Sequence, residues 1–208
     1  MGTDNAQILD IGGSRLNESL RDMLVSRMLT PGNQCVLPSA LLSDDNGSVL
    51  WQQINRLPDY YQTREEISLL EAHGNDIADL IAPNTVLVDI GCGVDHFKLT
   101  FPSDTRKIFP LLSLLDQSQK SIQYYGLDLS LEALRSNISK LAASFKHVQC
   151  HGLWGTFDDA RRYAPTLSPA SSPRWFLSLG SILGNDFPMP AVGILRSWRD
   201  CADARGRG

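Results

Sequence analysis

Two apolar segments of this chain end in residues that could bind a nucleoside. Residues 85–90 (Thr-Val-Leu-Val-Asp-Ile) run into Gly91-Cys-Gly93, and residues 122–128 (Ile-Gln-Tyr-Tyr-Gly-Leu-Asp) end in the carboxylate of Asp128. An apolar run that breaks at glycines is typical of a buried parallel strand followed by a tight turn, where the backbone can approach a ligand closely. An acid at the end of the neighbouring strand can accept hydrogen bonds from ribose hydroxyls. The pair predicts a site for an adenosine-containing cofactor.

The spacing of the glycines distinguishes between a dinucleotide and other adenosine-containing cofactors. A dinucleotide site has the pattern G-x-G-x-x-G with an acid about 20 residues further on, whereas Val94, Asp95 and His96 follow Gly93, and Asp128 lies 37 positions after Gly91. A nicotinamide oxidoreductase is therefore disfavoured. The combination of an acid-ended strand (Asp89), a glycine turn and a second acid-ended strand (Asp128) fits S-adenosylmethionine (SAM) better. Both carboxylates also have structural alternatives, since Asp89 could cap a helix and Asp128 could be the N-cap of the helix that follows it.

The hydrophobic pattern indicates which elements hold these residues. Helices are expected at 17–28, around 50–54, at 64–82 (with Thr63 and Glu66 at the spacing of a capping box), at 107–115 and at 129–143 (with Ser130 as its cap). Strands are expected at 8–11, 85–90, 122–127, 147–152 and 175–179, with a loop at 162–174. Strands that alternate with helices predict an α/β fold with a parallel sheet and right-handed crossovers.

Composition narrows the classes of partner. The chain has 208 residues and a net charge of −4, so a nucleic-acid partner is not expected. No apolar run approaches the ~20 residues of a membrane span, and the first residues do not resemble a secretory signal, so we expect a cytoplasmic protein without a membrane partner. The four histidines and four cysteines lack the spacing of a metal site, so no metal is expected. The oligomeric state is not indicated.

Five segments together resemble one enzyme family. In order they are Asn55-Arg-Leu-Pro-Asp-Tyr-Tyr-Gln-Thr-Arg-Glu-Glu66, Val88-Asp-Ile-Gly-Cys-Gly93, Tyr125-Gly-Leu-Asp-Leu-Ser130, Gly152-Leu-Trp-Gly-Thr-Phe-Asp-Asp159 and Leu179-Gly-Ser-Ile-Leu-Gly-Asn-Asp-Phe187. They are similar to the motifs of the histidine-specific SAM-dependent methyltransferases. That family includes histidine Nα-methyltransferases of ergothioneine synthesis and fungal 4-dimethylallyltryptophan N-methyltransferases of ergot alkaloid synthesis, and Gly-Thr-Phe-Asp-Asp159 looks closest to the latter.

The resemblance implies a role for each matched residue. It places the cofactor at Gly91 and Lys107, the ribose at Asp128, and the adenine between Thr156 and Phe157. It makes Tyr60 and Asn185 contacts to a small amino-acid substrate. Each residue also has a purely structural alternative. Tyr60 could pack in the turn before its helix, Asn185 could be a turn residue, Phe157 could be a core residue, and Lys107 could be a solvated lysine. We assign no catalytic residue, because a free α-amine has a pKa of about 7.7–8.0 and its deprotonation costs only about 1 kcal/mol.

The same resemblance implies a domain plan and two departures from it. Residues 1–83 would form a mostly helical cap that contributes to the substrate site, residues 84–200 a partial Rossmann-like class I methyltransferase sheet, and residues 201–208 a disordered tail. Residues 94–102 resemble an insertion in the glycine loop, and the family's C-terminal region is missing. The expected function is methylation of the amine of 4-dimethylallyltryptophan. The alternatives are histidine Nα-methylation in ergothioneine synthesis and a truncated, non-catalytic product of such a gene.

Overall fold

Parallel strands form the centre of the protein. The computed structural model describes residues 6–29, 41, 45–92, 105–167, 169, 172–180 and 188–202. Within these residues lies a five-stranded sheet of order β1-β4-β3-β2-β5, in which every neighbouring pair is parallel. The strands are β1 (Ile8–Asp10), β2 (Thr85–Ile90), β3 (Ile122–Asp128), β4 (Val148–Trp154) and β5 (Arg174–Leu177). The predicted Rossmann-like α/β class is confirmed.

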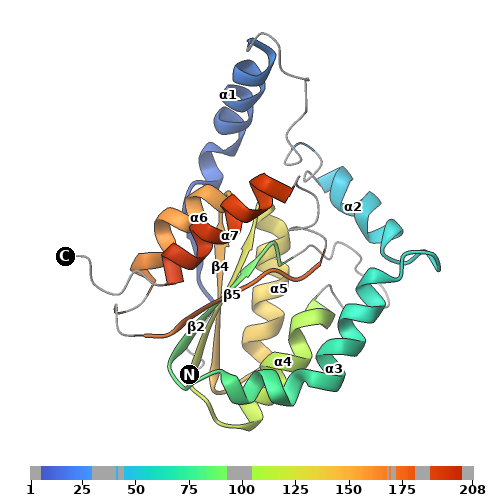
Figure 1. Ribbon diagram of the computed structural model, residues 1–208, viewed down its shortest axis with the longest axis vertical. Coiled ribbons are helices and arrows are strands. Elements are labelled where there is room, and N and C mark those ends of the chain that lie inside the picture. The colour runs from blue at the N-terminus through green and yellow to red at the C-terminus, as the bar shows by residue number, and fades with distance from the viewer. Residues whose placement is uncertain are drawn as a thin grey trace.

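Helices cover both faces of this sheet, as Figure 1 shows. On one face, α3 (Gln62–Leu80), α4 (Thr105–Gln117) and α5 (Leu131–Ser144) pack on residues such as Leu87 and Tyr124. On the other face, α6 (Phe157–Tyr163) and α7 (Pro188–Ala202) pack on residues such as Val88 and Tyr125. Successive strand residues point to opposite faces, so both faces of the central strands are buried and these strands are largely apolar.

The central strands and the helix between β3 and β4 agree with the sequence pattern. β2 has the predicted bounds, and β3 ends one residue later than predicted. Ser130 is the N-cap of α5 and its side chain accepts a hydrogen bond from the Ala133 N–H, as the sequence predicted. Residues that are close together in the sequence determine these elements. An apolar run forms each strand, and a serine at the helix start accepts a hydrogen bond from one of the free N–H groups of the first turn.

The predicted capping box at the start of α3 is wrong. The helix begins at Gln62, one residue before the expected cap, and its N-cap residue Tyr61 makes no side-chain capping bond. The Thr63 hydroxyl instead donates to Asn55 Oδ1 at 3.2 Å, and both side chains are buried. Glu66 accepts a hydrogen bond from Gly180, 114 residues away along the chain. Thr63 and Glu66, which the local pattern assigned to a helix cap, therefore make tertiary contacts instead.

Two helices lie where the sequence pattern indicated none. The end of α6 and a short 3-10 turn (Ala164–Thr166) occupy part of the stretch expected to be a loop from 162, and α7 begins at Pro188. Thr156 and Asp159 form a reciprocal capping box that begins α6. The prolines at 188 and 190 lie in the first turn of α7, where proline costs no intrahelical hydrogen bond.

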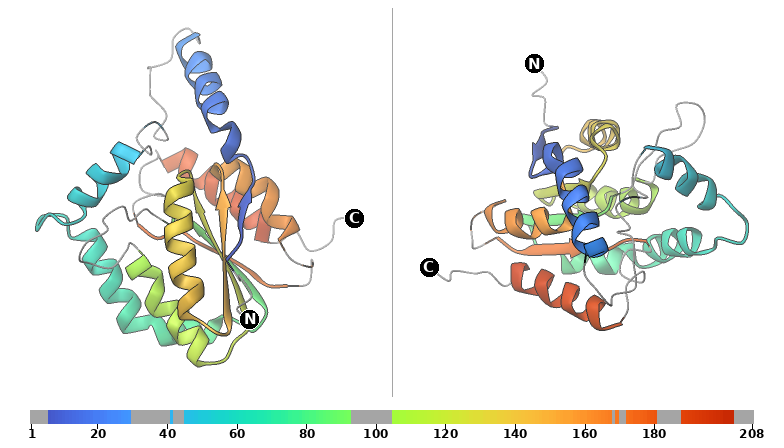
Figure 2. Two further views of the ribbon diagram at one scale, coloured as in Figure 1. Left: turned by 180° about the vertical axis from the view of Figure 1, so that it is seen from behind. Right: turned by 90° about the horizontal axis from the view of Figure 1, so that it is seen from above.

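The N-terminal segment divides between the sheet and two outlying helices. β1 pairs with β4 at one edge of the sheet, with Ile8 opposite Gly152. α1 (Leu16–Leu29) then projects away from the end of the sheet, and α2 (Asp45–Ile54) lies beside the start of α3 (Figures 1 and 2). Residues 203–208, the part of the predicted tail beyond α7, lie outside the described residues.

Candidate functional site

The glycine turn after β2 is fixed to the end of β3. Gly91 has a φ of 76°, a conformation that costs a residue with a Cβ roughly 1–2 kcal/mol. The backbone N–H groups of Gly91 and Cys92 both donate to the carbonyl oxygen of Leu127, at 3.1 and 3.0 Å. The predicted turn is therefore present and is held by the residue that precedes Asp128. Gly93 and the proposed insertion at 94–102 lie outside the described residues.

A second glycine lets the turn lie close to β3. A Cβ on Gly126 would come within 2.9 Å of the Cys92 Sγ and 3.3 Å of its Cβ. The Cys92 side chain therefore packs directly against Gly126, and a larger residue at position 126 would displace it. The sequence showed this signal as a glycine inside an otherwise apolar strand, which is typical of a close approach.

Asp128 lies at the carboxyl end of β3, beside the turn. Its Oδ1 accepts a hydrogen bond from the Ser130 N–H at 2.9 Å, and its side chain is half-buried. Since α5 is capped by Ser130, the alternative in which Asp128 is the N-cap is wrong. The structure thus places the acid next to the glycine turn.

Thr156 and Phe157 lie at the next strand end. Trp154 of β4 is opposite Asp128, and the Gly155 N–H donates to the Asp128 carbonyl oxygen at 3.2 Å. The Thr156 hydroxyl donates to Asp159 Oδ2 at 2.6 Å, within the capping box of α6. Phe157 is 39% exposed and is not a core residue. Three neighbouring strands, β2, β3 and β4, therefore end in residues that the sequence assigned to one cofactor site.

Asp89 is one of the two strand-end acids that favour SAM in the sequence, but no contact with the cofactor was predicted for it. It is buried in β2, and its Oδ2 accepts a hydrogen bond from the Tyr124 hydroxyl at 2.9 Å, so it does not cap a helix. Its Oδ1 is buried and has no hydrogen-bond partner among the described residues. Burial raises the pKa of Asp89 to about 7. The signal in the sequence was an acid within the apolar run of residues 85–90.

Lys107 is bound to another carboxylate. It lies in the first turn of α4, and its Nζ is 2.8 Å from Glu66 Oε2 of α3. Its side chain is 16% exposed, so Lys107 is not simply solvated. The Lys107 charge also acts on Asp89, where it favours the ionised form. Lys107 is therefore on the side of the site formed by β2 and the helices that cover it.

Of the two residues expected to contact the substrate, Tyr60 and Asn185, the structure describes Tyr60 and shows it in contact with residues of α2 and α3. Tyr60 lies in the turn before α3, where its ring contacts Trp51 edge-on at 5.5 Å between centroids, and its hydroxyl donates to Gln62 Oε1 at 2.8 Å. This agrees with the packing alternative for Tyr60. These two partners lie in α2 and at the start of α3, rather than at the strand ends. Asn185 lies outside the described residues.

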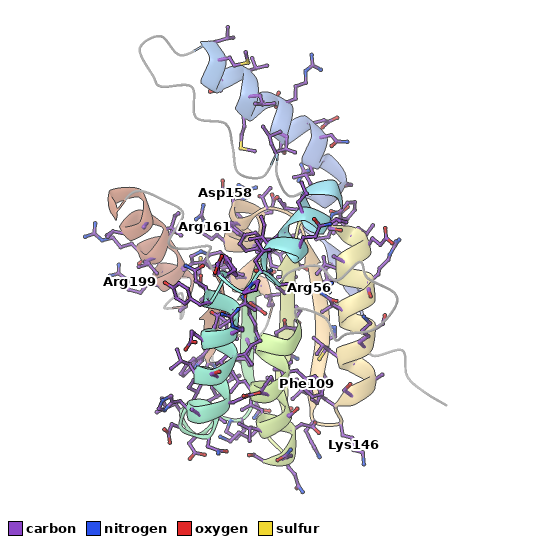
Figure 3. All side chains as sticks on the ribbon, turned by 90° about the vertical axis from the view of Figure 1, so that its right-hand side faces the viewer. Arg56, Phe109, Lys146, Asp158, Arg161 and Arg199 are labelled. Carbon is purple, nitrogen blue, oxygen red and sulfur yellow. The ribbon has the colours of Figure 1, made fainter. Side chains whose placement is uncertain are left out.

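The residues present fit an adenosyl cofactor. A turn with a positive φ and no Cβ admits close approach of a ligand, the carboxylate beside it can accept from hydroxyls, and Asp89 Oδ1 supplies a buried acceptor without a partner. Figure 3 shows that Arg56, in the turn after α2, lies toward the carboxyl ends of the strands, and that Lys146, which precedes β4, lies at the opposite end. Open α/β sheets bind ligands at the carboxyl ends of their strands.

Among the described side chains, no group of three or more His, Cys, Asp or Glu could hold a metal ion. Of the helices in the described ranges, none combines the length and hydropathy that a membrane crossing requires.

Comparison with known proteins agrees with the geometry. The profile of the histidine-specific, SAM-dependent methyltransferases matches residues 18–207. The chain is 33% identical over 198 residues to ergothioneine biosynthesis protein 1 of Neurospora crassa, which covers 95% of this chain and 21% of that protein. It is 30% identical to the 4-dimethylallyltryptophan N-methyltransferase easF of Claviceps purpurea (91% of this chain, 52% of that protein). It is 32% identical to the N-methyltransferase dtpB of Aspergillus flavus (93% and 52%). The chain thus spans about half the length of these two N-methyltransferases.

Proposed function

Because this chain belongs to the histidine-specific, SAM-dependent methyltransferase family, we propose that it transfers a methyl group from SAM to the amine of an amino acid. The observation that carries the proposal is the contact between the glycine turn and the end of β3, where the Gly91 and Cys92 N–H groups share the Leu127 carbonyl beside Asp128. This is the place where an open α/β sheet binds an adenosyl group.

Each residue of the site then has a role that its chemistry permits. Gly91 offers bare backbone, Asp128 accepts hydrogen bonds from the ribose, and Thr156 and Phe157 flank the adenine. Lys107 supplies a positive charge on the same side. When bound, SAM supplies an electrophilic methyl group on its sulfonium, so the protein mainly contributes position and exclusion of water.

No general base is identified on the amino-acid side of the site. The α-amine of a peptide has a pKa of about 7.7–8.0, and in a free amino acid the adjacent carboxylate raises the pKa of the amine further. Only the minor neutral fraction near pH 7 can therefore act as the nucleophile. Tyr60 and Asn185 orient the amino acid through hydrogen bonds in this proposal, and no residue is assigned as a general base.

We place 4-dimethylallyltryptophan first as the substrate and histidine second. The first choice is supported by the Gly-Thr-Phe-Asp-Asp159 segment and by similarity to the Claviceps purpurea enzyme. The second is supported by similarity to the Neurospora crassa ergothioneine protein. A chain that binds SAM without turnover is the third candidate, because the two N-methyltransferase relatives are each about twice as long as the matched region.

A methyl-transfer assay separates these candidates. The chain is incubated with SAM that carries a labelled methyl group and with 4-dimethylallyltryptophan, histidine or tryptophan, and the products are identified by mass spectrometry. We expect label in N-methylated 4-dimethylallyltryptophan, and none when Asp128→Ala replaces the wild type. Label in histidine alone selects the second candidate. SAM binding by calorimetry without any labelled product selects the third, and absence of both contradicts the proposal.

A further inference from the structure

Glu66 joins three segments that are far apart in the sequence. It lies in the second turn of α3, and its Oε2 is 2.8 Å from the Lys107 Nζ at the start of α4. Its Oε1 accepts a hydrogen bond from the Gly180 N–H, 2.6 Å away, after β5. One carboxylate thus holds the helix that follows the glycine loop and the backbone that follows the neighbouring strand.

The backbone at Gly180 is adapted to this contact. Gly180 has a φ of 85°, and a Cβ there would come within 2.9 Å of the Lys107 Nζ. The lysine ammonium, the Glu66 carboxylate and the Gly180 backbone therefore meet at one point, and a side chain at 180 would have to displace the ammonium. The Glu66 and Lys107 side chains are 25% and 16% exposed, so this contact is mostly shielded from water.

The close contact of the Lys107 ammonium is with Glu66, although a second acid, Asp89, is within reach of its charge. Asp89 lies near enough that the charges of both Lys107 and Glu66 act on it. The hydrogen-bond partner of Asp89 is the Tyr124 hydroxyl, and its Oδ1 has none among the described residues. Because the close contact of Lys107 is with Glu66, Asp89 keeps a free acceptor atom beside the glycine turn. Without the Glu66 charge, the ammonium would be attracted toward Asp89.

We propose that Glu66 is a positioning residue of the cofactor site, which acts through Lys107 by holding its ammonium against the Gly180 backbone and away from Asp89. The inference rests on the proposed function and deepens it. It assigns to the methyltransferase site a residue of α3 that the sequence pattern had assigned to a helix cap.

The test is a double-mutant cycle on SAM affinity, measured by titration calorimetry with wild type, Glu66→Gln, Lys107→Met and the double variant. Glu66→Gln removes the charge but keeps an oxygen that can accept from Gly180. We expect SAM binding to weaken on the order of tenfold in Glu66→Gln. We expect the double variant to bind no more weakly than Lys107→Met alone, because Glu66 acts through the lysine.

Two further variants control for charge and folding. Glu65→Gln makes the same charge change at the adjacent, exposed position and should bind SAM as the wild type does. Glu66→Asp keeps the charge but is one methylene shorter, so we expect an intermediate affinity. Thermal unfolding of every variant shows whether a weaker affinity reflects loss of the fold.

The outcomes separate this inference from the proposed function. If the wild type binds SAM and Glu66→Gln does too with equal affinity, or if the losses of the two single variants add in the double variant, the inference is wrong and the function stands. If Glu66→Gln is too unstable to bind, Glu66→Asp decides between the same two results. If the wild type does not bind SAM, the proposed function fails and the inference fails with it.

Discussion

The carboxyl ends of β2, β3 and β4 differ sharply from the N-terminal helices in how they are held. Every residue of β2 is buried, and its neighbours on both sides are fixed by strand pairing. On α1 and α2 large apolar side chains face solvent, for example Met28, which is 71% exposed, and Leu50, which is 60% exposed. The sheet therefore fixes the proposed cofactor side of the site, and the region that carries Tyr60 is attached to it more loosely.

Several polar contacts hold the region that carries Tyr60. Asn55 and Thr63 bond to each other across the turn between α2 and α3, and the Arg64 guanidinium donates to three backbone oxygens of the same turn. Glu66 then links α3 to α4 and to the end of β5. Net stabilisation by such bonds is about 0.5–1.5 kcal/mol each, whereas a fully buried leucine contributes more. Substitutions in the two regions should differ accordingly.

The largest expected difference is between a core and a surface leucine. Leu134 of α5 is fully buried against the sheet, and Leu50 of α2 is largely exposed. Leu134→Ala should lower the free energy of unfolding by about 2–5 kcal/mol, because it leaves a cavity. Leu50→Ala should change it by less than about 0.5–1 kcal/mol. Urea unfolding of both variants checks this, and equal effects would show that α2 is as tightly packed as the sheet.

A second contrast uses pH. The pKa of Asp89 is about 7 in the folded chain, against 3.8 for an ordinary aspartate, because burial disfavours the charged form. Between these values the folded chain holds a proton that the unfolded chain has released, so this group lowers stability as pH rises from 3.8 to about 7. Asp89→Asn removes the titration. The stability of the variant relative to wild type should rise by up to about 1.4 kcal/mol per pH unit in that interval.

The matched control is Asp59→Asn, in the exposed turn before α3. Its stability relative to wild type should be nearly constant across the same interval. Urea unfolding at three or four pH values measures both differences. A flat difference for Asp89→Asn would mean that Asp89 is ionised in the folded chain.

The smallest predicted change in stability concerns two glycines. Gly91 has a φ of 76°, so Gly91→Ala should cost roughly 1–2 kcal/mol and weaken SAM binding. Gly193, in α7, has open space around the position of a Cβ, so Gly193→Ala should be neutral or stabilise by up to about 1 kcal/mol. Thermal unfolding and calorimetry with SAM check both. Unchanged SAM affinity in Gly91→Ala would argue that the turn does not contact the cofactor.

The sequence predicted best what local patterns determine. The apolar runs gave the strands β2 and β3 almost to the residue, and the serine before an amphipathic stretch gave the cap of α5. The adjacency of Gly91 and Asp128 also followed, because neighbouring parallel strands end at the same edge of a sheet.

The sequence failed where tertiary contacts compete with local ones. Thr63 and Glu66 have capping-box spacing, but the contacts of Thr63 with Asn55 and of Glu66 with Lys107 and Gly180 could not be read from neighbours in the chain. α6 is only seven residues long, and the first turn of α7 contains prolines, so neither gave a clear helical pattern. The role of Asp89 depends on burial, which appears only once Tyr124 lies beside it.

The central claim is that the glycine turn and Asp128 together bind the adenosyl group of SAM. Isothermal titration of the wild type and of Asp128→Ala with SAM tests it most directly, with thermal unfolding to show that both are folded. We expect a measurable affinity for the wild type and its loss in Asp128→Ala. Equal affinity in the two folded proteins would contradict the account.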